Sequence, residues 1–133
     1  MRTVAAVLVP WIVWGLLDTV IYMAVSSLYP DSFGVDGEPL TRIMLLLFLV
    51  LRAGYSLIAG WIVGRMAGLD NTACRATVVL LLLTGVVAQV VNRGMYPLWY
   101  HVVFVLSIVP CLKLGMRLGA RPGSELDPHT SAA

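Results

Sequence analysis

Two opposite charges inside apolar segments are the side chains best placed to do chemistry in this chain. Asp18 lies within the first long apolar stretch, and Arg52 lies within the second. A charged side chain at the centre of a membrane helix costs about 2.5–3.5 kcal/mol on insertion scales, so such residues usually have a partner or a function. An ion pair would satisfy both charges, whereas a lone carboxylate would favour proton or ion transport.

The two charges are expected at the same depth. Asp18 lies about nine residues before the expected end of its helix near Ser27, and Arg52 about nine residues after the expected start of the next helix near Ile43. At 1.5 Å per residue, both are roughly 13 Å from the same membrane face. Because consecutive antiparallel helices are usually neighbours, the sequence predicts contact between Asp18 and Arg52.

Polar residues at helical spacing extend this pair into a candidate site. Side chains three or four positions apart share a helix face, which groups Tyr22 with Asp18 and Tyr55 with Arg52. The third segment adds two amides. The candidate intramembrane polar site therefore comprises Asp18, Tyr22, Arg52, Tyr55, Gln89 and Asn92. Two interpretations remain open: a polar cavity facing outward, or ordinary hydrogen bonds between helices, which we favour.

Small residues recur at every fourth position of the second apolar segment. They are Ser56, Gly60, Gly64 and Gly68. Small side chains let two helix backbones approach closely, which gives packing that hydrophobicity cannot provide in lipid. The run therefore predicts a tight helix contact. Its partner is either another helix of the chain, which we favour, or a second copy.

The elements that carry these residues are four apolar segments. The chain has 133 residues, of which 59% are hydrophobic and 12% charged. That composition would leave a soluble domain with far too much exposed apolar surface. The sequence predicts an all-α fold, an integral membrane four-helix bundle running up-down-up-down over residues 1–119. The expected helices cover about 4–27, 43–66, 73–91 and 98–118, each near the ~20 residues that cross a bilayer.

The joints between segments carry turn and capping signals. Asp70 or Asn71 is expected to cap the third helix, and Pro97 suits the first turn of the fourth. Pro110 should kink that helix because proline removes a backbone hydrogen bond. The segment 120–133 is small, polar and proline-bearing, and we expect a disordered cytoplasmic tail.

Basic residues predict how the bundle is oriented. Cytoplasmic flanks of membrane helices are enriched in Lys and Arg. With four spans, one side holds six basic residues and the other two: Arg2, Arg65, Arg75, Lys113, Arg117 and Arg121 against Arg42 and Arg93. Both termini are therefore expected in the cytoplasm, with the protein in a bacterial inner membrane. Tyr29, Tyr96, Trp99 and Tyr100 are then expected to form an outer aromatic belt.

The sequence carries no catalytic or cofactor signature. It has no nucleotide-binding glycine motif, no serine-hydrolase or zinc-protease motif, and no basic patch for nucleic acid. His101 is expected to be solvated or hydrogen-bonded, and Cys74 and Cys111 to be reduced thiols in packing roles. We therefore expect the protein to have no enzymatic activity, no bound metal and no cofactor.

One pattern resembles a known group of proteins. The run from Ala59 to Gly68, followed by a helix and then Pro97-Leu98-Trp99-Tyr100-His101, is similar to small uncharacterised four-helix bacterial inner-membrane proteins. The resemblance implies no activity. We expect a structural, assembly or partner-binding component. The alternative is a small homo-oligomeric transporter or channel using a polar outer-half cavity around Asp18 and Arg52. Small multidrug transporters resemble the chain in length and first-helix acid, but usually lack a counterpart of Arg52.

Overall fold

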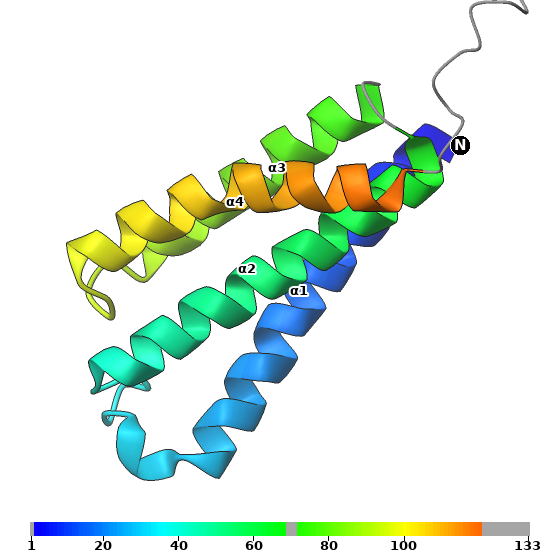
Figure 1. Ribbon diagram of the computed structural model, residues 1–133. Coiled ribbons are helices and arrows are strands. Elements are labelled where there is room, and N and C mark those ends of the chain that lie inside the picture. Colours follow the sequence, from blue (N-terminus) through cyan, green and yellow to red (C-terminus); the bar gives the residue numbers. More distant parts are fainter. Residues whose placement is uncertain (1, 69–71, 121–133) are drawn as a thin grey trace, which may run out of the picture.

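Four long helices make up most of the protein, as the sequence predicted. The computed structural model describes residues 2–68 and 72–120. The helices are α1 (Arg2–Leu28), α2 (Arg42–Ala67), α3 (Thr72–Val91) and α4 (Leu98–Gly119), with a short 3-10 turn, η1 (Pro30–Ser32), after α1 (Figure 1). The described residues contain no strand, only one isolated bridge between Phe33 and Pro39. The all-α prediction is confirmed.

All four helices are long and apolar enough to cross a membrane. Their length and composition are those of a multi-pass membrane protein. The predicted helix ranges differ from the observed bounds by at most two residues. α2 begins after Thr41, whose hydroxyl accepts a hydrogen bond from the Met44 amide and so caps the helix. α4 continues through Pro110 to Gly119. The expected caps Asp70 and Asn71 and the tail 121–133 lie outside the described residues.

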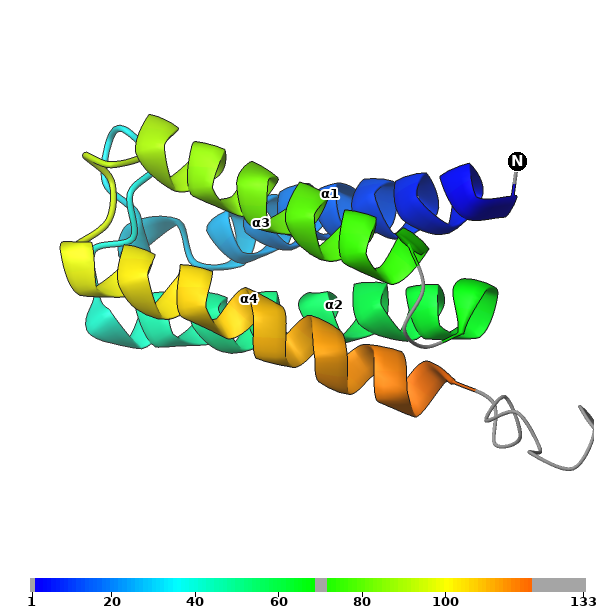
Figure 2. The same ribbon diagram turned by 90° about the horizontal axis from the view of Figure 1, so that it is seen from above.

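Successive helices run in opposite directions, so the bundle has two distinct ends (Figure 2). We call the end with segments 29–41 and 92–97 the loop end. The terminal end holds the start of α1 and the end of α4. Around the bundle the order is α1, α2, α4, α3, and the most extensive contact joins α2 to α4. These two helices run parallel, although they are not consecutive.

A reciprocal glycine contact joins α2 and α4 in the half nearer the terminal end. At each of four glycines, a carbonyl oxygen of the opposite helix occupies the space that a Cβ atom would need. The four are Gly60 and Gly64 in α2 and Gly115 and Gly119 in α4. The tight contact predicted for the small-residue run is therefore made within the chain. Its α4 half was missed, although two glycines at a spacing of four were visible in the sequence.

The other two members of the predicted run have different roles. Ser56 faces α1, where its hydroxyl accepts a hydrogen bond from Trp14 Nε1 at 3.0 Å. Gly68 follows the last residue of α2 with φ of +75°, a conformation that glycine adopts without strain. Among the described residues beyond its chain neighbours and its own helix backbone, no atom lies within 4 Å of where its Cβ would be, so Gly68 ends the helix and does not extend the close contact with α4.

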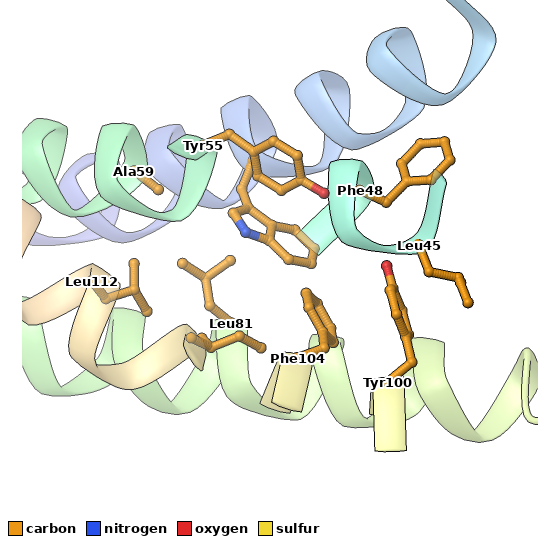
Figure 3. Packing of buried hydrophobic residues seen from close by; sticks show 10 residues of the cluster. Leu45, Phe48, Tyr55, Ala59, Leu81, Tyr100, Phe104 and Leu112 are labelled. Carbon is orange, nitrogen blue, oxygen red and sulfur yellow. The ribbon is translucent and has the colours of Figure 1, made fainter. Parts of the chain in front are cut away.

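Aromatic side chains fill the half of the bundle nearer the loop end. There α2 and α4 diverge (Figure 1), and rings from three helices occupy the space between them (Figure 3). Trp14 of α1 meets Tyr55 of α2 edge to face, with ring centroids 5.6 Å apart. Phe104 and Tyr100 project from α4 and are almost fully buried. The backbones of α2 and α4 are therefore in contact at their glycines near the terminal end, and aromatic side chains separate the two helices near the loop end.

The segment between α1 and α2 folds back onto this aromatic half. Tyr22 donates a hydrogen bond to the carbonyl of Gly37 at 2.7 Å. Gly37 has φ of +80°, so a side chain there would strain the turn. Phe33 lies edge to face with both Tyr22 and Phe48. The segment thus covers the loop end next to α1 and α2.

Candidate functional site

Asp18 and Arg52 form an ion pair between α1 and α2. Arg52 Nε donates to Asp18 Oδ1 at 3.0 Å. The Arg52 side chain is 11% exposed and that of Asp18 34% exposed, so the pair is buried chiefly on the arginine side. Both residues sit near the middle of their helices, and equal depth on antiparallel neighbours brings them together.

Tyr55 binds the same carboxylate. Its hydroxyl donates to Asp18 Oδ1, the oxygen that Arg52 also contacts. Arg52 and Tyr55 are three positions apart in α2, so both point toward α1 from one face. Two donors from one helix therefore hold a single carboxylate on the next helix.

α4 completes the surroundings of Arg52. Arg52 Nη1 donates to the Tyr100 hydroxyl at 2.8 Å. Three ring centroids also lie near the guanidinium carbon, at 4.9 Å for Phe104, 5.7 Å for Tyr100 and 5.8 Å for Tyr96. Ring faces attract cations, and more strongly where water is excluded. We call Asp18, Arg52, Tyr55 and Tyr100 the polar network.

Tyr96 links the polar network to the loop end. Its ring stacks on Tyr100, with centroids 4.8 Å apart and an interplanar angle of 15°. Burial raises the pKa of Tyr96, and the positive charge of Arg52 opposes that rise. The phenol therefore remains protonated at neutral pH, next to the guanidinium of Arg52.

Three of the six predicted site residues lie elsewhere. Tyr22 bonds to the backbone of Gly37, as described above. Asn92 Nδ2 donates to the carbonyl of Ala88 in its own helix at 2.8 Å. Gln89 turns toward α4, where its Oε1 meets His101 Nδ1. The structure brings Asp18, Arg52 and Tyr55 together and leaves Tyr22, Gln89 and Asn92 outside the polar network.

His101 forms a second polar cluster with Gln89. Its Nε2 lies 3.0 Å from the carbonyl of Tyr96, while Nδ1 faces the Gln89 side chain. Both ring nitrogens therefore have hydrogen-bonding partners. The cluster joins α3 to α4 next to Tyr96, so His101 is hydrogen-bonded, one of the two states expected for it.

The contribution of α4 to the site was not predicted from the sequence. Tyr100 and Phe104 share one face of α4, and Tyr96 precedes the helix at the same spacing of four, which was a readable signal. We expected Tyr96 and Tyr100 in an outer aromatic belt. For Tyr100 that expectation is wrong, because the side chain is 0% exposed and faces Arg52. Trp99 and Tyr29 are exposed, at 41% and 52%.

Residues 2–68 and 72–120 contain no candidate metal site. No group of three His, Cys, Asp or Glu side chains there could hold an ion. The thiol of Cys74 donates to the carbonyl of Gly68 at 3.0 Å. What the polar network does in this arrangement is connect three helices through charge and hydrogen bonds.

Comparison of the chain with models of protein families, with curated proteins and with solved structures gives no match.

Proposed function

We propose that this protein is a structural membrane component, which takes part in assembly or binds a partner, and that its polar network fixes how α1, α2 and α4 dock. The observation that supports this is the neutralisation of both charges within the chain. Asp18 has Arg52 and Tyr55 as donors, and Arg52 has Asp18, Tyr100 and three ring faces. A charge satisfied in this way does not need a ligand.

The energetics favour the same role. Breaking a buried ion pair is costly because one charge is left without compensation, whereas the intact pair adds little net stability. The presence of such a pair is better explained by the specific packing of helices that it requires. Arg52 can reach Asp18, Tyr100 and Phe104 together only when α1 and α4 both flank α2, so the polar network specifies one order of helices.

A small homo-oligomeric transporter or channel is the second candidate. The observation in its favour is the partial exposure of Asp18, whose side chain is 34% exposed. In an oligomer built through α1, that carboxylate would face a neighbouring copy and could bind a proton or cation. This role requires Asp18 to exchange partners during each cycle.

Flux measurements separate the two candidates. The purified protein, reconstituted in vesicles with a pH-sensitive dye inside, is expected to show the same proton leak as protein-free vesicles under an imposed membrane potential. The same result is expected for sodium and potassium. A flux that depends on protein concentration and is lost in Asp18→Asn, with the variant still folded, would establish the transporter and refute the structural role.

We further propose a bacterial inner-membrane location with both termini in the cytoplasm. The support is the excess of Arg and Lys flanking one side of the four spans, six residues against two. The segment 29–41 also carries three acidic residues, Asp31, Asp36 and Glu38, which suits the outer side. The terminal end of the bundle would then face the cytoplasm.

Cysteine labelling tests this orientation. Val35 is the natural site because it is fully exposed in the segment between α1 and α2. In intact spheroplasts, Val35→Cys is expected to react with a membrane-impermeant maleimide, whereas Ser124→Cys should react only after permeabilisation. The unsubstituted protein is the control for background labelling of the native cysteines, Cys74 and Cys111. Labelling of Ser124→Cys in intact spheroplasts would exclude four spans with cytoplasmic termini.

A further inference from the structure

A groove of about 660 Å³ lies between α3 and α4 near the terminal end. Its lining combines three basic side chains with apolar ones. The lining residues are Cys74, Arg75, Val78 and Val79 from α3, and Lys113, Met116 and Arg117 from α4. None of these residues belongs to the polar network, and only Met116 takes part in the glycine contact, through its backbone carbonyl opposite Gly64.

The lining is layered along the helix axes. Arg75 lies in the first turn of α3 and Arg117 in the last turn of α4, so both charges are at the terminal end. Val78 and Val79 follow about one turn deeper, and Val79 is 56% exposed. Lys113 lies one turn deeper than Arg117 on the same face, from which its long chain can extend back toward the polar end. A ligand that fits both layers has an anionic head and an apolar tail.

The positive charge of this groove has no counterpart among the described residues. The described acidic residues are Asp18, Asp31, Asp36 and Glu38, which all belong to α1 or to segment 29–41. The one ion pair found within residues 2–68 and 72–120 joins Arg52 to Asp18. Three basic side chains therefore share one groove that opens on the side of the helices, where a membrane protein meets lipid.

We propose that this groove binds an anionic phospholipid. Arg75, Arg117 and Lys113 contact the phosphate of the headgroup, and an acyl chain lies along Val78, Val79 and Met116. Basic pockets between membrane helices on the cytoplasmic side are suited to anionic headgroups. The apolar layer distinguishes this ligand from a soluble phosphate, which would gain nothing from valine and methionine. Binding depends on the membrane location of these helices and not on the role of the polar network.

The test uses the full chain in neutral detergent micelles, titrated with dioleoyl-phosphatidylglycerol. Melting temperature and lipid adducts in native mass spectrometry are the two readouts. The lipid is expected to raise the melting temperature of the unsubstituted protein. In the double variant Arg75→Gln/Arg117→Gln, the apparent affinity should fall about 30-fold, since each basic residue near an anionic lipid contributes about five-fold. Lys113→Gln alone should give a smaller loss.

A charge-matched control comes from the same end of the bundle. Arg2→Gln/Arg65→Gln removes two positive charges near α1 and α2, away from the groove, and should keep the full lipid response. Equal losses in both double variants would mean a general surface-charge effect and would overturn the proposal. An equal response to dioleoyl-phosphatidylcholine would reduce the site to an apolar groove. An equal response to inorganic phosphate would make it a simple anion site. Both results also overturn the proposal.

Discussion

Replacing Arg52 by glutamine is expected to destabilise the protein by about 3–5 kcal/mol, the usual cost of leaving one partner of a buried ion pair without the other. Arg52→Gln removes the charge that Asp18 Oδ1 contacts at 3.0 Å and the donor to Tyr100. It also removes the guanidinium group from among the three aromatic rings. Unfolding by SDS in mixed micelles measures the change.

The matched control removes both charges together. The double variant Asp18→Asn/Arg52→Gln leaves no uncompensated ion, so it is expected to recover part of the stability lost in either single variant. Exchanging the charges, by Asp18→Arg with Arg52→Asp, is a poorer test. It would place a carboxylate against ring faces that are themselves negative. If Arg52→Gln unfolds like the unsubstituted protein, the ion pair does not hold α1 to α2.

Adding one methyl group at two glycines of α2 is expected to have opposite effects. Gly60→Ala should destabilise the protein by about 1–3 kcal/mol, the usual cost of overpacking. The new Cβ would overlap the carbonyl of Leu112, and a backbone cannot move aside as a side chain can. The new Cβ of Gly54→Ala meets no atom within 4 Å in the described parts of the chain beyond its chain neighbours and its own helix backbone, so this change should stabilise the helix by about 0.5–1 kcal/mol.

Unfolding by SDS in mixed micelles measures the change in stability of both variants. Gly115→Ala extends the test to α4, because its Cβ would overlap the carbonyl of Leu57 in α2. Its loss of stability should be similar to that of Gly60→Ala. If alanine is tolerated equally at Gly54, Gly60 and Gly115, then α2 and α4 are not in backbone contact, and the parallel pairing described above is incorrect.

Helix identity and depth were readable from the sequence because they depend on local properties. Hydropathy over about 20 residues defines a membrane helix, and counting from its end gives the depth of Asp18 and Arg52. Tyr55 followed from its spacing to Arg52. Each of these inferences needs only one helix, or one helix and its successor.

The order of helices around the bundle was not readable, and this explains the errors at the site. Periodicity shows which residues share a face but not which helix that face meets. Gln89 faces His101 of α4 instead of Arg52, and Asn92 bonds to its own helix. Tyr100 is buried because α4 lies beside α2, a pairing between segments that are separated in the chain by α3.

The position of the ion pair in the first hairpin affects how the protein is made. Asp18 and Arg52 are 34 residues apart, so at about 5–20 residues per second the ribosome produces the arginine about 2–7 s after the carboxylate. α1 and α2 can then leave the translocon as one electrically neutral hairpin, without waiting for the rest of the chain.

α4 is synthesised last, yet it supplies Tyr100, Phe104 and the glycine contact. Until it arrives, Gly60 and Gly64 present bare backbone to lipid, and Arg52 lacks its aromatic surroundings. The nascent hairpin is therefore an incomplete product that only the last helix can finish. Chains truncated before α4 would expose the backbone at Gly60 and Gly64 and leave Arg52 uncovered. These features would distinguish them from full-length chains for a membrane protease.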